Sequence, residues 1–208
     1  MAFIVATATG FPPHYYSQDE MICALRQFWA ARHSNLDRLE RFHRHMLVEG
    51  RHLALPLEAY AHLSGFGASN DAWIEVALNL GERTLRALLE QAGIGAEEIS
   101  QLTFTTVTGI AVPSIDARLM NRIPFSRHLK RVPVFGLGCL GGVAGVARVA
   151  DYLRGQPEEA AILLSIELCS LTLQPQDLSV ANIISSGLFG DGAAAVLMVG
   201  DAHRLARP

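Results

Sequence analysis

The sequence predicts an α/β fold built around a largely parallel core sheet. Segments rich in apolar and β-branched residues alternate with helical patterns along the 208-residue chain, and this alternation is typical of layered α/β proteins. Two segments, Ala160–Glu167 (AAILLSIE) and Ala193–Val199 (AAAVLMV), are continuous apolar runs. Such runs are expected of strands that are covered on both faces. The length is sufficient for a substantial core.

The first elements follow from local patterns. The apolar segment Phe3–Ala8 predicts a strand. Ser17–Glu20 (SQDE) has the form of a capping box and predicts a helix that begins there and runs to about Arg32. A second helical pattern covers Leu36–Leu47, with arginine and histidine on its outer face.

The middle of the chain continues the alternation. Asn70 and Asp71 are suitable caps for a long helix that ends near Gly93. The β-branched segment Gln101–Thr108 (QLTFTTVT) predicts a strand. Val132–Leu137 predicts a further short strand, and a helix is expected to begin directly after it, at Cys139.

Composition and charge exclude several classes of protein. The net charge of −3 gives no electrostatic argument for binding nucleic acid or an anionic membrane. No apolar run is long enough for a transmembrane helix, and the first residues lack the basic region of a signal peptide. The three cysteines, Cys23, Cys139 and Cys169, are widely spaced, which predicts neither a disulfide framework nor a metal site. We therefore expect a cytoplasmic protein.

Cys139 lies where a strand meets a helix. Gly138 permits a tight turn before the helix, and the first helical turn has unpaired N–H groups and a partial positive charge. These groups would stabilise a thiolate and a developing oxyanion, so Cys139 is a candidate nucleophile.

Two other interpretations of this segment stay open. Cys139 could be a small buried apolar residue. Alternatively, Gly136–Gly141 (GLGCLG) has the G-x-G-x-x-G form of a dinucleotide-binding turn, and the next predicted strand ends in the acidic Glu167.

Several motifs together resemble one family. In chain order, the matching segments are PPHYYSQDE (Pro12–Glu20), GRHLALP (Gly50–Pro56), TTVTGIAVPSIDARL (Thr105–Leu119), GLGCLGG (Gly136–Gly142), SIELCSLTLQ (Ser165–Gln174) and GLFGDGAAAVLMVG (Gly187–Gly200). The ordered set resembles the N-terminal half of the type III polyketide synthases, the chalcone- and stilbene-synthase-like branch of the thiolase superfamily. The resemblance implies a thiolase-like layered fold with a buried nucleophile-bearing helix, and one N-terminal domain over residues 1–208.

The resemblance also implies a reaction. Cys139 falls on the nucleophile that takes an acyl group from an acyl-CoA starter and holds it as a thioester. Malonyl-CoA is then decarboxylated, and the resulting carbanion extends the chain by one ketide unit. CoA thioesters are the substrates, and neither a further cofactor nor a metal is implied. ELCSLTLQ is closest to the bacterial synthases that make alkylpyrones or alkylresorcinols from long acyl starters.

Further site residues are carried over from the family's motifs. Phe189 falls on the gatekeeper between the CoA tunnel and the reaction cavity. The cavity-lining positions are Thr108, Cys169, Thr172 and Ser185. The positions that bind CoA phosphates are Arg38, Arg41 and His45, whose i, i+3, i+7 spacing places them on one helix face; without the family, such a helix would be read as a solvated face.

Two features of the resemblance concern partners. The family's catalytic histidine and asparagine belong to a C-terminal half that has no counterpart in this sequence, so we expect that the chain needs that half for the complete reaction. Val112 falls where the family inserts a side chain across a dimer interface, so a homodimer is expected.

Two alternatives to this function remain. A ketoacyl synthase III-like initiating enzyme shares the cysteine and the GDGAA turn, but it condenses onto an acyl carrier protein. A non-catalytic fragment that acts as an interaction or dimerisation module predicts that Cys139 is no more reactive than Cys23.

Overall fold

The computed structural model describes residues 1–30 and 35–206. The chain forms two compact units. Unit 1 contains residues 1–10, 74–167 and 192–208, and unit 2 contains residues 11–73 and 168–191. In the part of the chain that the structure describes, no helix is long and apolar enough to cross a membrane.

Unit 1 contains a five-stranded sheet in the order β1-β7-β6-β4-β5. Its strands are β1 (Ala2–Gly10), β4 (Ile99–Thr106), β5 (Lys130–Phe135), β6 (Ala160–Leu168) and β7 (Asp191–Gly200). β4 runs parallel to both β5 and β6, whereas β1 pairs with β7 in the antiparallel sense. The sheet is thus mixed with a parallel part, and the predicted α/β fold class is confirmed.

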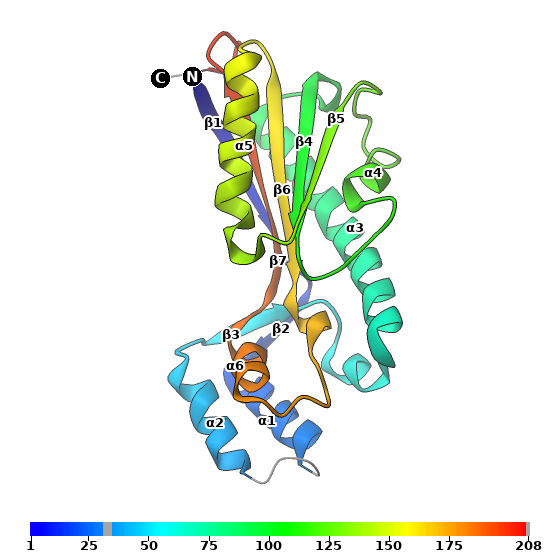
Figure 1. Cartoon of the computed structure of the whole chain (residues 1–208), viewed down its shortest axis with the longest axis vertical. Helices are drawn as coiled ribbons and strands as arrows, with labels where there is room; N and C mark the ends of the chain where they lie inside the picture. Colours follow the sequence, from blue (N-terminus) through cyan, green and yellow to red (C-terminus); the bar gives the residue numbers. More distant parts are fainter. Residues whose placement is uncertain (31–34, 207–208) are drawn as a thin grey trace. The chain divides into compact units, whose positions relative to one another are not determined.

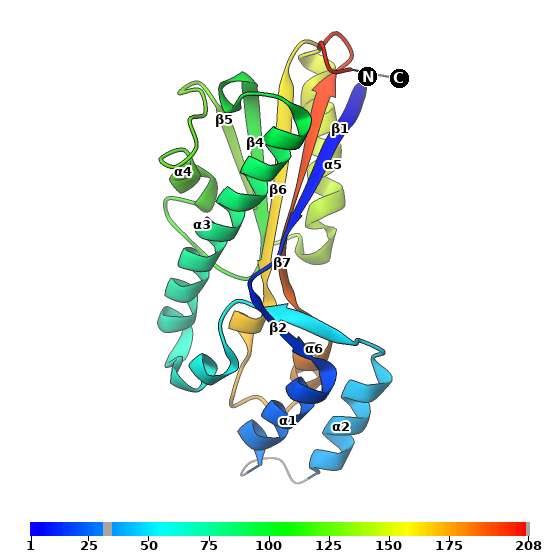
Figure 2. The same cartoon turned by 180° about the vertical axis from the view of Figure 1, so that it is seen from behind.

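Helices cover both faces of this sheet, as Figures 1 and 2 show from opposite sides. On one face, α5 (Gly141–Gly155) packs so closely that a Cβ at Gly145 would lie 2.5 Å from Leu163 Cδ1. On the other face lies the unit-1 part of α3 (Gly65–Ala92), where a Cβ at Gly81 would lie 2.9 Å from Ile166 Cδ1. Being covered on both sides explains why β6 is an almost unbroken apolar run.

The described residues of unit 2 include a two-stranded antiparallel sheet, three helices of its own and the first part of α3. β2 (His14–Ser17) pairs with β3 (Gly50–Leu53). The helices are α1 (Gln18–Trp29), α2 (Leu36–His45) and α6 (Val180–Leu188). Their apolar faces form one core cluster, whose buried members are Met21, Leu25, Trp29, Leu39, Leu53 and Ile183.

Most predicted elements are present, with shifted ends. The capping box is confirmed: the Ser17 side chain accepts from the Glu20 N–H, and the Glu20 carboxylate accepts from the Ser17 N–H. The expected end of this helix at Arg32 lies outside the described residues. The second helix ends at His45, because Leu47 adopts a left-handed φ of 55° that no helix can continue through.

The predicted start of the long helix at Asn70 is wrong. α3 begins at Gly65, which has a φ of 82°, and Asn70 and Asp71 lie inside the helix. Capping residues cost little in a helix interior, so their presence does not fix where a helix begins. The short strands β2 and β3 and the helices α4 (Ile115–Leu119) and α6 were not predicted.

Candidate active site

The candidate nucleophile lies in a tight turn after β5. Cys139 belongs to a 3₁₀ turn, η3 (Gly138–Leu140), and α5 begins two residues later, rather than at Cys139 itself as predicted. Gly136 and Gly138 have φ values of 91° and 56°, which glycine adopts without steric cost. The turn expected at Gly138 is therefore present.

The exposure of this segment differs from the expected buried helix. Cys139 is an exposed thiol, and α5 is buried only on the face that meets the sheet. The outer side chain Val143 is 72% exposed. The physical reason is that a 15-residue amphipathic helix has one face to bury against one sheet, so its other face stays open in this chain.

Thr108 and Glu167 lie at the same edge of the sheet as Cys139. β4, β5 and β6 are parallel, so their carboxyl ends meet there. The Thr108 hydroxyl donates to Glu167 Oε2 over 2.8 Å, and the Val107 N–H lies 3.1 Å from each Glu167 carboxylate oxygen. Burial raises the pKa of Glu167, and these donors oppose that shift.

Gly141 holds the nucleophile turn against β4. A Cβ on Gly141 would lie 2.6 Å from Thr105 Oγ1, so any larger residue would displace the first turn of α5. The absence of a side chain at this position allows the segment that carries Cys139 to approach the carboxyl end of β4 closely.

Four further predicted site residues belong to unit 2. Cys169 and Thr172 form part of the 3₁₀ turn η4 (Cys169–Thr172), where the Thr172 hydroxyl donates to the Cys169 carbonyl over 2.7 Å. Ser185 donates to a carbonyl of its own helix, α6. Phe189 directly follows α6, and its side chain is 43% exposed.

A buried carboxylate connects the segments that carry these residues. Asp191 accepts from the Ala54 N–H over 2.6 Å and from the Ser170 N–H over 2.8 Å, and the Ser170 hydroxyl also donates to it. The Tyr60 hydroxyl shares a hydrogen bond with that of Ser170 over 2.5 Å. Burial raises the pKa of Asp191 to about 6, against the opposing effect of its donors. Burial and the nearby Asp191 also raise the pKa of Tyr60.

The predicted CoA-binding side chains lie on the exposed side of α2. Arg38, Arg41 and His45 are exposed, and none of the three forms an ion pair within residues 1–30 and 35–206. The Arg38 guanidinium lies 5.2 Å from the centre of the Phe42 ring, a cation–π arrangement. The predicted common face is therefore present.

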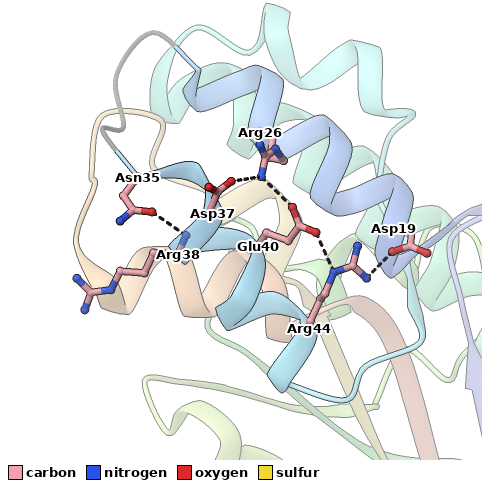
Figure 3. Close-up of polar contacts among 7 residues, drawn as sticks. All are labelled: Asp19, Arg26, Asn35, Asp37, Arg38, Glu40 and Arg44. Carbon is pink, nitrogen blue, oxygen red and sulfur yellow. Dashed lines mark hydrogen bonds and ion pairs between the residues drawn. The ribbon is translucent and has the colours of Figure 1, made fainter.

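Other basic side chains near α2 are engaged in ion pairs. Arg26 contacts Asp37 at 3.2 Å and Glu40 at 2.8 Å, and Arg44 contacts Glu40 at 2.9 Å and Asp19 at 2.8 Å. Figure 3 shows this series joining α1 to α2, with the Arg38 side chain pointing away from it. Within the described residues, α2 thus has one face whose arginines form ion pairs and another whose basic side chains form none.

The sequence interpretation gave no site role to several residues of these networks. They are Tyr60, Ser170 and Asp191 in unit 2, and Arg51, whose guanidinium donates to the Ser186 and Phe189 carbonyls. The sequence predicts Glu167 only as the acidic residue of a dinucleotide site. Arg51 lies in the GRHLALP segment and Asp191 in GLFGDGAAAVLMVG. Both segments carry the family resemblance, but a motif does not indicate which side chains its residues contact. Only the folded chain brings Ala54, Ser170 and Asp191 together.

Comparison with known proteins identifies relatives of this chain. The N-terminal domain of chalcone and stilbene synthases matches residues 1–202. The 1,3,6,8-tetrahydroxynaphthalene synthase of Streptomyces peucetius subsp. caesius is 48% identical over 202 residues, which are 97% of this chain and 53% of that protein. A putative chalcone synthase of Bacillus subtilis (strain 168) is 37% identical over 206 residues, which are 97% of this chain and 56% of that protein.

A solved structure agrees with these sequence relatives. The 1,3,6,8-tetrahydroxynaphthalene synthase of Streptomyces coelicolor A3(2), described as a bacterial type III polyketide synthase, has a TM-score of 0.88 at 29% identity. The match covers 93% of this chain and 56% of that one. The chain spans about half the length of the curated relatives it matches.

These findings argue against the dinucleotide-binding interpretation. In this structure Glu167, the acidic residue of that interpretation, accepts hydrogen bonds from the Thr108 hydroxyl and the Val107 N–H. The family match covers 202 of the 208 residues. The chain therefore belongs to the family of chalcone and stilbene synthases and corresponds to their N-terminal domain.

Proposed function

We propose that this chain supplies the nucleophile-bearing half of a CoA-dependent polyketide synthase. The observation that carries the proposal is the exposed thiol of Cys139, set in a tight turn at the edge of the sheet where β4, β5 and β6 end. Backbone N–H groups at the start of a helix can hold a developing oxyanion, which suits an acyl-transfer step at a cysteine just before the helix.

The proposed reaction has three steps. The Cys139 thiolate attacks the carbonyl of an acyl-CoA, forming a new thioester while CoA leaves as a thiolate. Malonyl-CoA loses CO₂, and the two electrons of the broken bond remain on the resulting carbanion. That carbanion attacks the acyl-Cys139 carbonyl, and the Cys139 thiolate is released as the new carbon–carbon bond forms. CoA thioesters are the substrates, and the proposal needs no other cofactor.

The other predicted residues have supporting roles in this proposal. Arg38, Arg41 and His45 would hold the phosphates of CoA, since several exposed basic side chains on one helix face suit a polyanionic group. Phe189 would act as the gatekeeper. Thr108, Cys169, Thr172 and Ser185 would line the reaction cavity.

The relatives' names bear on the starter group. Two kinds of relative are named after products whose names include no alkyl group. They are the tetrahydroxynaphthalene synthases and the phloroglucinol synthase of Pseudomonas fluorescens, which is 29% identical over 191 residues. The long acyl starter expected from the sequence therefore stays a prediction. A product without an alkyl chain could be assembled from malonyl-CoA alone, so malonyl-CoA is tested beside a long-chain acyl-CoA.

Apolar surface in unit 1 is consistent with a protein partner. Val112, at the position expected to cross a dimer interface, is 89% exposed, and Phe135, Leu140 and Val143 are also exposed. Exposed apolar patches are typical of interaction sites. We propose that a second copy and the histidine- and asparagine-bearing C-terminal half cover this surface in the working enzyme.

Acyl transfer to the chain tests the proposal directly. The protein is incubated separately with malonyl-CoA and with a long-chain acyl-CoA, and its intact mass is measured. We expect an acyl adduct that persists in Cys23→Ala, the matched exposed cysteine, and disappears in Cys139→Ala. An adduct that survives in Cys139→Ala would refute the assignment of the nucleophile. No adduct on the folded wild-type chain would show that loading depends on the C-terminal half. A condensation step that requires an acyl carrier protein rather than free malonyl-CoA would favour the ketoacyl synthase III-like alternative.

A further inference from the structure

The backbone around Phe189 is held by side chains from three other segments of unit 2. Arg51 Nη1 donates to the Ser186 carbonyl over 2.8 Å and to the Phe189 carbonyl over 3.2 Å. Arg51 Nη2 donates to the Gly187 carbonyl and to Gln18 Oε1. One guanidinium therefore binds three carbonyls within a four-residue stretch. We propose that Arg51 is a positioning residue that fixes the backbone of the gatekeeper Phe189.

The character of the guanidinium supports this role. Arg51 is only 5% exposed, so its Nη1 and Nη2 groups have given up water for the carbonyls at the end of α6 and for Gln18 Oε1. Its buried Nε has no hydrogen-bond partner in the part of the chain that the structure describes. A cation is stabilised at a helix carboxyl end, where unpaired carbonyls carry partial negative charge. The planar fork of arginine can bind several carbonyls at once, which the single ammonium of lysine cannot reproduce.

His43 also packs against the end of α6. His43 is fully buried, and its Nε2 lies 2.9 Å from the Ile183 carbonyl. A Cβ on Gly187 would lie 2.3 Å from His43 Cδ2, and one on Gly190 would lie 3.0 Å from Arg51 Cβ. The backbone before and after Phe189 thus passes close to His43 and Arg51, and a side chain at Gly187 would require His43 to move.

The Phe189 side chain is partly exposed, whereas its backbone is hydrogen-bonded on both sides. It is 43% exposed, while its N–H donates to the Ser185 carbonyl over 3.1 Å and its own carbonyl is bound by Arg51. A fixed backbone that presents a partly exposed ring is the arrangement expected of a residue that must meet a ligand in a defined geometry. This inference rests on the gatekeeper role of Phe189 given under the proposed function.

The test compares two substitutions of Arg51 with a matched control. Arg51→Met keeps much of the side-chain volume and removes every donor, whereas Arg51→Lys keeps the charge without the fork. Arg44→Met is the control, because Arg44 is an exposed arginine that contacts carboxylates and lies outside this turn. Hydrogen exchange of the Phe189 amide is measured on the whole chain, with the α1 amides as internal reference.

We expect the Phe189 amide to exchange about tenfold faster or more in Arg51→Met, as loss of charge-assisted hydrogen bonds implies. Arg51→Lys should fall between Arg51→Met and wild type, and Arg44→Met should match wild type. Unchanged exchange at Phe189, or an equal acceleration throughout α1, would overturn the proposal. If Arg51→Met does not fold, Arg51→Lys decides by the same comparison.

A second measurement separates this inference from the proposed function. In chains that load an acyl group, the acyl-CoA concentration for half-maximal loading should change in Arg51→Lys, while alkylation of Cys139 by iodoacetamide should not. A wild-type chain that accepts no acyl group would contradict loading by this chain alone. The exchange of the Phe189 amide would still decide whether Arg51 fixes that backbone.

Discussion

The close contact between α5 and the sheet makes a quantitative prediction about two glycines of one helix. A Cβ at Gly145 would lie 2.5, 2.9 and 3.3 Å from three carbons of Leu163, whereas a Cβ at Gly142 would meet nothing within 4 Å. Ordinary carbon–carbon contacts begin near 3.5 Å. The alanine methyl at Gly145 therefore requires a shift of about 1 Å by Leu163 or by α5.

The surroundings of Leu163 prevent an inexpensive adjustment. Leu163 is buried in a cluster with Val149, Leu153 and Met198. Overpacking of such a core costs about 1–3 kcal/mol. Replacing glycine by alanine within a helix stabilises it by up to about 1 kcal/mol. Because both substitutions carry that gain, their difference isolates the packing cost.

We expect Gly142→Ala to be as stable as wild type or more stable, and Gly145→Ala to be about 1–3 kcal/mol less stable than Gly142→Ala. The assay is urea denaturation followed by circular dichroism, with the slope compared between variants so that a change in stability is separated from a change in the denatured state. Equal stability of the two variants would refute the close packing of α5 on β6 at this position.

Three further predictions concern charge and pH. Because its folded pKa is raised from 3.8 to about 6, Asp191 contributes stability below pH 3.8 that is lost as the pH rises through about 6; the loss is on the order of 3 kcal/mol. In Asp191→Asn, the free energy of unfolding should change less with pH over the ~2 pH units between pH 4 and 6 than it does in wild type. Substitution of an exposed aspartate, Asp71→Asn, should leave the pH dependence of wild type in place. Burial lowers the pKa of His43, so its contribution to stability is present above the unfolded value of 6.5 and is lost as the pH falls below it. The thermal unfolding midpoint of wild type should exceed that of His43→Gln at neutral pH, and the difference should narrow in acid; a difference that does not change with pH would contradict this. Arg38→Gln should weaken CoA binding about tenfold by calorimetry, whereas the ion-paired Arg44→Gln should change it by less than about twofold; equal losses would argue against a distinct phosphate-binding face.

The alternation of strands and helices was determined by the sequence alone. Continuous apolar runs predicted β6 and β7 because strands covered on both faces have no polar side to show. The capping box predicted the start of α1 at Ser17, since its two reciprocal hydrogen bonds involve residues only three apart. Motif order predicted Cys139 as the nucleophile candidate, and its glycine-containing turn is present.

Only the tertiary structure decided which of these features contact one another. Asp191 binds Ala54 and Ser170, and Arg51 binds the end of α6, across separations of about 20 to 140 residues that carry no local periodicity. Similarly, the spacing of Arg38, Arg41 and His45 placed them on one face, but the ion pairs of Arg44 became visible only when α1 lay beside α2. Local patterns fix backbone conformation because neighbouring residues generate them, whereas charge neutralisation and burial depend on residues that only the fold brings close.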